Sequence, residues 1–284
     1  MTLFEEAQRL YSNGVTEDSI AEKLGLGRPQ IREWLFEGVR PRFDRYDPDL
    51  TPRPDLAYLI GFWLGDGRSA GNQKKVRFKL ADMKQLDYVN RLLARLLDRE
   101  PKPLLMDGPF YVVDYDTSVL YDYLAQPLSK LKPCILAFKA DFLRGFFDAE
   151  GYVSIGANIS KRRLHEVVGA ANSDGEYLRL VRGLLGQLEI PTSMCVTNRK
   201  GEPMTIRGRT WVRKHDVRHV SITRDQLIRR FFDAVGFRNP AKQEKLEDLA
   251  FLQKLPSEER FNWFVNHYEK RGRRWYKKGA RPDD

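Results

Sequence analysis

The 284-residue sequence predicts a mixed α/β (α+β) fold in which two similar halves follow a small all-helical module. Two nine-residue segments, 59–67 and 143–151, nearly repeat each other. After each segment, alternating strand-like patterns and helix-like patterns follow in the same order. Because duplicated halves tend to pair as a homodimer would, we expect a pseudo-two-fold arrangement of two αββαββα units.

The first 40 residues have the pattern of three short helices, of which the first covers 3–11. The second helix begins after Thr16, whose hydroxyl can cap it. Small and apolar residues then follow at offsets that resemble the helix-turn-helix family of DNA-binding modules over about 35 residues: Ala21, Gly25, Leu26, Ile31, Trp34 and Leu35. The resemblance implies that Arg28, Gln30 and Arg32 face outward and contact DNA. A helical hairpin that serves only packing would share much of this pattern.

Each later half is expected to contain a motif helix, two strands, a helix, two strands and a helix. The strands and helices are predicted at 74–80, 82–93, 110–115 and 118–124 in the first half, and at 153–171, 174–185, 211–222 and 224–235 in the second. The predicted domains are a helix-turn-helix at 1–40, a proline-containing linker at 41–54, a first half at 55–138, a second half at 139–250 and a basic extension at 251–284. The end of that extension either grips phosphates or is simply solvated.

Composition limits the classes of function. Lys and Arg number 49 against 39 Asp and Glu, so the formal net charge is +10 and a polyanionic partner is favoured. The mean hydropathy of -0.54 is too low for an integral membrane protein. Cys134 and Cys195 lack neighbours at the spacing of a zinc site. We expect an intracellular protein, cytoplasmic or organellar, with no secretory signal and no membrane partner.

Both motif helices carry a glycine in the middle of an apolar run. Gly61 and Gly145 each weaken a helix by about 1 kcal/mol relative to alanine. This loss is understandable if the two helix backbones approach closely, so we expect Gly61 to pack on the helix of Gly145.

Each motif ends in an acid followed by a glycine. Asp66 and Glu150 lie at the expected helix C-termini, and Gly67 and Gly151 suit helix termination. Two carboxylates at negative helix ends repel each other and call for a cation. Mg²⁺ typically binds one or two carboxylates together with substrate phosphates. In basic surroundings this favours metal-assisted phosphodiester hydrolysis.

Both motifs resemble the LAGLIDADG signature, and the chain resembles a monomeric two-motif LAGLIDADG homing endonuclease. The resemblance implies a saddle of two four-stranded sheets in the major groove of double-stranded DNA, which makes double-strand breaks at a long asymmetric site. It also implies that Asp66 and Glu150 hold Mg²⁺, or Mn²⁺ or Ca²⁺ in the same site, with the carbonyls of Gly65 and Ala149 as further ligands.

The chain departs from the signature in two respects. Leu64 replaces the earlier acid of the first motif, whereas the second motif has Asp148 there, a position that concerns the helix interface more than chemistry. The family's accessory lysine has three candidates in the expected region, Lys79, Lys84 and Lys161.

DNA contacts are expected from alternate strand residues and from the connecting loops. The residues predicted to bind DNA in this region are Lys74, Lys75, Arg77, Lys79, Lys161, Arg162, Arg163, Arg199, Lys200, Arg207, Arg209 and Arg213. His215 and His219 are expected on one face of a strand, as surface or DNA contacts and not as metal ligands.

Two alternatives use the same scaffold. The first is a catalytically inactive LAGLIDADG regulator that binds DNA, which the helix-turn-helix favours and the two acids oppose. The second is an intron maturase that binds structured RNA.

Overall fold

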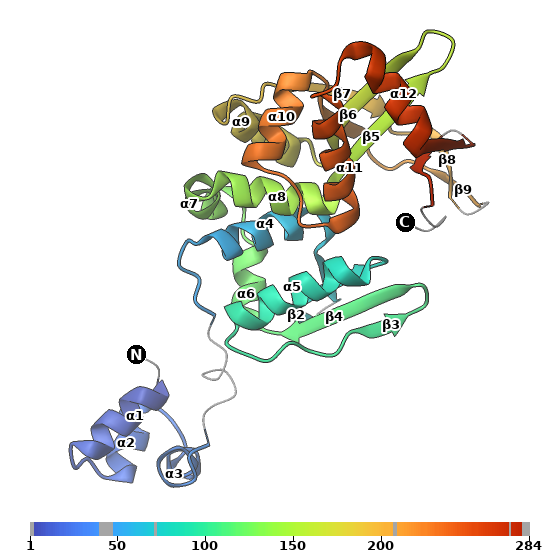
Figure 1. The fold of residues 1–284 in the computed structure, drawn as a ribbon. Coiled ribbons are helices and arrows are strands. Elements are labelled where there is room, and N and C mark those ends of the chain that lie inside the picture. Colours follow the sequence, from blue (N-terminus) through green and yellow to red (C-terminus); the bar gives the residue numbers. More distant parts are fainter. Residues whose placement is uncertain (1–2, 40–47, 71–72, 207–208, 273, 280–284) are drawn as a thin grey trace. The chain divides into compact units, whose positions relative to one another are not determined.

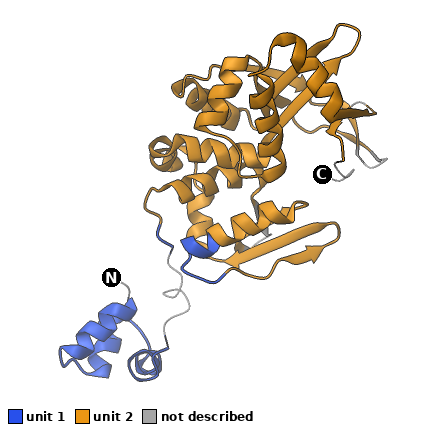
Figure 2. Cartoon of the chain, viewed as in Figure 1, with its two compact units in different colours: residues 1–49, 93–100 blue, residues 50–92, 101–284 orange. Residues whose placement is uncertain are grey.

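The computed structural model describes residues 3–39, 48–70, 73–206, 209–272 and 274–279, without the side chains of 68–70, 73, 206 and 209. The chain divides into two compact units (Figure 2). Unit 1 comprises residues 1–49 and 93–100, and unit 2 comprises 50–92 and 101–284. Most of the predicted linker, at 40–47, lies outside the described residues.

Unit 1 contains the three predicted helices, α1 (Leu3–Ser12), α2 (Glu17–Leu24) and α3 (Arg28–Phe36). The Thr16 hydroxyl caps α2 by accepting from the backbone N of Ser19, as expected. Gly25 ends α2 at φ 66°, a left-handed conformation that favours glycine. The three helices share one apolar core made of Phe4, Ala7, Leu10, Ile20, Ala21, Ile31 and Trp34.

The first half follows the predicted order and adds one more helix. Its elements are α4 (Pro54–Asp66), β1 (Arg68–Ala70), β2 (Gln73–Leu80), α5 (Met83–Leu96), β3 (Leu105–Asp107), β4 (Phe110–Asp116), α6 (Ser118–Leu124) and α7 (Leu128–Ala137).

The second half repeats this order and carries an insertion. Its elements are α8 (Lys139–Glu150), β5 (Gly151–Asn158), β6 (Arg163–Asn172), α9 (Gly175–Gln187), β7 (Ser193–Asn198), β8 (Pro203–Ile206), β9 (Arg209–Val212), β10 (Val217–Ile222) and α10 (Asp225–Ala234).

The alternating segment expected over 211–222 does not lie in one sheet. Trp211 and Val212 belong to the separate hairpin β8–β9, and only Val217–Ile222 joins the sheet. The backbone N of Arg213 donates to the Glu202 carbonyl, which closes the base of the hairpin. An alternating pattern does not distinguish one strand from two that a turn separates.

The two sheets have the same topology, which confirms the α+β fold. Their strand orders are β1-β2-β4-β3 and β5-β6-β10-β7, and the pairings are antiparallel (Figure 1). If the β8–β9 hairpin is left out and the strands of each half are numbered along the chain, both sheets have the strand order 1-2-4-3. One face of each sheet is apolar and buried, as Val76 and Phe78 of β2 and Val168 of β6 illustrate.

The C-terminal region continues as α11 (Pro240–Leu252), α12 (Ser257–His267), β11 (Tyr268–Arg271) and β12 (Arg274–Lys277). Its strands form an antiparallel hairpin. The Trp275 ring lies 4.9 Å from that of Phe264, and Lys277 Nζ lies 2.7 Å from Glu244 Oε1. The described part of the basic tail is therefore folded, which neither interpretation of the sequence anticipated.

Candidate nucleic-acid and metal site

The two motif helices contact each other backbone to backbone through their glycines, as predicted. A Cβ added at Gly61 would lie 2.1 Å from the Phe142 carbonyl oxygen, and one at Gly145 would lie 2.0 Å from that of Tyr58. Real Cβ atoms essentially never approach so closely. In Figure 1, α4 and α8 lie side by side between the two halves.

The predicted acids come together where these helices end. Asp66 is the last residue of α4, and Glu150 is the last residue of α8. A Cβ added at Gly65 would lie 2.5 Å from the Ala149 Cβ and 2.8 Å from the Glu150 Cγ, so the two ends touch.

The glycines after the acids end the two helices, as expected, but in extended conformation. Gly67 and Gly151 have φ of −67° and −83° and lead directly into extended backbone. A Cβ at Gly67 would lie 2.3 Å from the Trp63 ring, and one at Gly151 would lie 2.3 Å from the Phe147 carbonyl oxygen. Close approach, not positive φ, therefore requires glycine at both positions.

The pKa of Glu150 is shifted by its surroundings at the acid pair. Burial, and next the negative charge of Asp66, raise the pKa of Glu150 to about 7. Asn172, at the end of β6, donates from Nδ2 to Glu150 Oε1 at 2.9 Å. Asn172 was not foreseen from the sequence, because its partner is 22 positions away and only the strand pairing brings the two together.

The cation beside the acids is Lys242 of α11, which sequence reasoning missed. Its Nζ donates to the carbonyl oxygens of Phe147 at 3.1 Å, Asp148 at 2.5 Å and Ala149 at 3.5 Å. It thereby caps α8, and its charge acts on both Asp66 and Glu150. Burial lowers the pKa of Lys242 while the surrounding carboxylates raise it.

The three lysines that the sequence favoured lie elsewhere. Lys79 Nζ lies 2.7 Å from Asp107 Oδ2 on the first sheet. Lys84 is exposed on α5, and Lys161 is exposed in the turn between β5 and β6. No sequence signal distinguishes Lys242, because 92 residues separate it from Glu150.

Asp148 belongs to the helix interface, as expected. It is buried and accepts from the Tyr58 hydroxyl at 2.6 Å and from the backbone N of Asn239 at 3.0 Å. Gln85 donates to the same hydroxyl at 2.8 Å, and the Asn239 side chain donates to Asp82 at 3.0 Å. This network joins the two motif helices to the start of α11.

The four basic residues predicted on the first sheet all meet acids. The separations are 2.6 Å for Lys74–Asp122, 3.1 Å for Lys75–Asp116, 2.6 Å for Arg77–Asp114 and 2.7 Å for Lys79–Asp107. Sequence reasoning noted the cations and overlooked these acids, although Asp114 and Asp116 alternate on β4.

The basic residues of the second half are mostly exposed at turns. Lys161 and Arg162 are exposed between β5 and β6, whereas Arg163 is the first residue of β6 and not a loop residue. Arg162 donates to Asn262 Oδ1 at 2.9 Å, and its guanidinium lies 5.0 Å from the centre of the Phe261 ring. It therefore packs on α12.

A second basic group lies around the inserted hairpin. Arg199 and Lys200 are exposed before β8, and Arg213 is partly buried after β9. Arg209 lies in β9, its side chain outside the description, and Arg207 lies outside the described residues altogether. The structure brings Arg199, Lys200, Arg209 and Arg213 to the hairpin and not to the second sheet.

The two histidines do not share a strand face. His215 is exposed in the turn before β10, whereas His219 lies within β10. His219 Nδ1 lies 3.3 Å from the Tyr152 hydroxyl, and burial lowers the pKa of His219. The spacing of four residues did not place the two histidines on one strand face, because β10 begins only at Val217, after His215.

In unit 1, Arg28 and Arg32 are exposed on α3 as predicted, and Gln30 is partly exposed. The Arg28 Nε lies 3.1 Å from Asp18 Oδ1 and 3.8 Å from Glu17 Oε2. Arg28 therefore braces α3 against α2 in addition to facing solvent.

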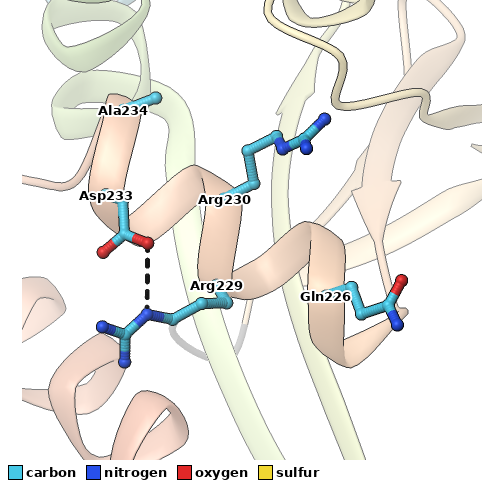
Figure 3. A pocket seen from close by; sticks show the side chains of 5 residues that line it. All are labelled: Gln226, Arg229, Arg230, Asp233 and Ala234. Carbon is cyan, nitrogen blue, oxygen red and sulfur yellow. Dashed lines mark hydrogen bonds and ion pairs between the residues drawn. The ribbon is translucent and has the colours of Figure 1, made fainter.

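An open pocket lies on α10, and Gln226, Arg229, Arg230, Asp233 and Ala234 line it (Figure 3). Arg229 pairs with Asp233 at 3.1 Å, and Arg230 pairs with Glu189 at 2.5 Å. Because both guanidinium groups already meet carboxylates, this pocket supports no separate anion site.

The donor set at the acid pair suits a hard divalent cation. Two carboxylates, with water and phosphate oxygens completing the shell, match the usual coordination of Mg²⁺. Among the described residues, no group of three or more His, Cys, Asp and Glu is arranged to hold a metal. None of the described helices is long and apolar enough to cross a membrane.

Comparison with known proteins agrees with this architecture. The model of the LAGLIDADG-like domain matches residues 53–97 and 137–236, just over half of the chain. A Methanocaldococcus jannaschii protein named Uncharacterized protein MJ0398 is 27% identical over 247 residues, which are 84% of this chain and 87% of that protein. A glutamine–fructose-6-phosphate aminotransferase of the same organism is 25% identical over 72% of this chain but only 18% of its own length.

Solved structures that resemble the chain are more distant in sequence. The homing endonuclease I-DmoI in complex with DNA and Ca has a TM-score of 0.48 and 17% identity, covering 68% of this chain and 97% of that chain. Full-length DUF199/WhiA from "Thermatoga maritima" has a TM-score of 0.46 and 18% identity, covering 78% and 68%. The family match, together with two motif helices that meet at their glycines, shows that the chain belongs to the LAGLIDADG-like domain family.

Proposed function

We propose that this protein is a site-specific endonuclease that binds double-stranded DNA and breaks both strands with the help of a divalent cation. The observation that carries the proposal is the meeting of Asp66 and Glu150 at the adjoining ends of α4 and α8, between two sheets of identical topology. Since both halves lie in one chain, the proposed acting species is a monomer inside the cell.

In this proposal Asp66 and Glu150 hold the cation, and the Gly65 carbonyl is a further candidate ligand. A bound Mg²⁺ would activate water and stabilise the leaving oxygen. Asn172 orients the Glu150 carboxylate through the bond to Oε1. Lys242 offsets the negative charge that the α8 C-terminus and the acid pair bring together.

We expect Asp66→Asn and Glu150→Gln to remove cleavage while leaving DNA binding largely intact. Each change replaces a charged ligand without altering the strand surface. Loss of an outer-shell group typically costs 10–100-fold, so loss of a ligand should cost more than about 100-fold. The measurement is cleavage of a randomised duplex library in Mg²⁺ and then in EDTA.

Asp141→Asn is the matched control for these two changes. Asp141 lies in the first turn of α8 and pairs with Arg144 at 2.9 Å. This variant should cut like the unaltered protein. Cleavage that survives in the Asp66→Asn, Glu150→Gln double variant would contradict the proposed role of the acids.

A second candidate function is DNA binding without cleavage, and Lys242 favours it. Its ammonium group already donates to the Ala149 carbonyl, which was expected to be a metal ligand, and acts on both acids. If this candidate is correct, duplex binding is unaffected by EDTA, and no metal supports cleavage. A structured-RNA partner has no comparable observation in its favour, and RNA competition against bound duplex tests it.

The N-terminal module is proposed to add DNA contacts beyond those of the sheets. We expect Arg28→Ala, Gln30→Ala and Arg32→Ala, combined in the full chain, to weaken binding and flatten its salt dependence. The slope should change by about 0.9 for each phosphate that the altered module no longer neutralises. Glu33→Ala, an exposed change on the same helix, is the control. If footprint length and salt slope both stay as they were, the module is a packing or partner-binding element.

A further inference from the structure

The outer face of the first sheet carries its charged residues in alternation with a buried face. Val76 and Phe78 of β2 are fully buried, so Lys75, Arg77 and Lys79 lie on the opposite face. This is the face that the proposed function directs toward DNA.

The neighbouring strands place acids on that same face. Val113 and Tyr115 of β4 are buried, so Asp114 and Asp116 lie opposite to them. In the strand register Arg77 is the direct partner of Asp114, and Lys75 is the direct partner of Asp116. The three outer-face cations of β2 thus meet three carboxylates, because Lys79 reaches Asp107 of β3.

The charged groups of these three pairs lie close enough to offset each other's charge. Arg77 Nη2 lies 2.6 Å from Asp114 Oδ2, and hydrogen bonding to Arg77 lowers the pKa of Asp114. Hydrogen bonding to Lys79 likewise lowers the pKa of Asp107. Asp114 and Asp107 are therefore held in their charged forms, and each described cation of this face, Lys75 with Asp116 included, has a carboxylate partner that offsets its attraction for phosphates.

The outer face of the second sheet differs from that of the first sheet in its acidic residues. Its buried face includes Val168 and Ala170 of β6, so Arg163, His165 and Val167 lie on the outer face. The other outer-face positions are Tyr152, Ser154, Gly156, Asn158, Gly169, Ala171, Ser193, Cys195, Thr197, Val217, His219 and Ser221. None of these positions, in the four strands as the structure describes them, is an Asp or a Glu. Equivalent faces of the two halves therefore differ in their acids: the cations of the first face are paired with carboxylates, and Arg163 on the second face has no acid at these positions beside it.

We propose that the two halves divide the work of DNA binding: the second half supplies phosphate contacts, and the first half reads a G·C base pair with the Arg77–Asp114 pair. This inference rests on the proposed binding of duplex DNA. An arginine donates to O6 and N7 of guanine, and a carboxylate accepts from N4 of cytosine. The pair thus presents donors and an acceptor side by side.

The ion pair with Asp114 prepares Arg77 for such a contact. It fixes the guanidinium on the strand surface, where the Arg77 side chain is 41% exposed. Asp114 therefore positions Arg77, and it also repels phosphates that approach without the matching base pair.

The test compares Asp114→Asn with the unaltered full chain on two probes, a random-sequence duplex and a randomised duplex library. Removal of the carboxylate should tighten binding to the random duplex and steepen its salt dependence by about 0.9, the slope of one phosphate. In the library, preference for G·C at one position should fall about 10-fold or more. Arg77→Gln should lose the same preference without tightening.

Two controls separate this effect from a general gain of positive charge. Asp233→Asn breaks the Arg229–Asp233 pair of α10 (Figure 3) and changes the net charge equally, yet it should leave slope and preference unchanged. Arg163→Ala, in the second half, should weaken binding to all sequences alike. Melting temperatures establish that each variant is folded.

The outcomes distinguish this inference from the function on which it rests. If the unaltered protein binds no duplex, the proposed function fails and the inference fails with it. If it binds duplex but Asp114→Asn keeps the original salt slope and base preference, the division of work is overturned alone. Weaker random-duplex binding by Asp114→Asn would also overturn it.

Discussion

Leucine in place of Gly61 is expected to lower the melting temperature by about 10 °C or more and to abolish DNA binding with it. Even a Cβ at this position would lie 2.1 Å from the Phe142 carbonyl oxygen and 2.8 Å from the Phe146 backbone N. Backbone atoms of a helix cannot move aside as a flexible side chain can. The cost should therefore reach or exceed the upper end of the roughly 1–3 kcal/mol typical of overpacking. At roughly 2–4 °C per kcal/mol for a domain of this size, about 3 kcal/mol or more corresponds to such a shift.

Gly183→Ala is the matched control, because Gly183 is a glycine in the interior of α9 with no atom within 4 Å of an added Cβ. Alanine there should stabilise the helix by about 0.5–1 kcal/mol. Thermal unfolding followed by circular dichroism measures both variants. A Gly61→Leu variant that melts with the unaltered protein would mean that the helices do not meet as described.

Methionine in place of Lys242 is expected to destabilise the protein in EDTA and to make its stability depend on Mg²⁺. The change keeps an unbranched side chain, one atom shorter, and removes the charged donor from the three carbonyls that end α8. Hydrogen bonds to charged groups contribute about 1.5–3 kcal/mol, so a loss of this size is expected. Asp66 and Glu150 then face each other without their neighbouring cation.

A divalent cation should compensate for the missing ammonium group. At a Mg²⁺ concentration of about 100 times its Kd, binding restores about 2.7 kcal/mol. Melting curves in EDTA and Mg²⁺ test this for Lys242→Met, the unaltered protein and the exposed control Lys84→Met. If Mg²⁺ stabilises all three equally, Lys242 does not compete with the cation, and the non-cleaving candidate loses its main support.

Local pattern was sufficient for most of the architecture. The repeated motif at 59–67 and 143–151, with its mid-helix glycines and terminal acids, predicted both the helix contact and the meeting of Asp66 with Glu150. Thr16 and Gly25 marked the limits of α2 for reasons that lie within a few residues. The β8–β9 hairpin was missed because Trp211 and Val212 continue the alternation that β10 resumes at Val217.

The sequence by itself therefore determined the duplicated α+β fold, the close helix pair and the acids at its end, because periodicity, glycine and helix ends act over short distances. Only the tertiary structure decided the charge balance around them. Lys242 and Asn239 contact α8 although each lies more than 90 residues from its partner along the chain. Arg77 and Asp114, which lie 37 residues apart, meet because β2 pairs with β4. Such contacts depend on where the packed elements bring side chains together, and no spacing along the chain encodes that.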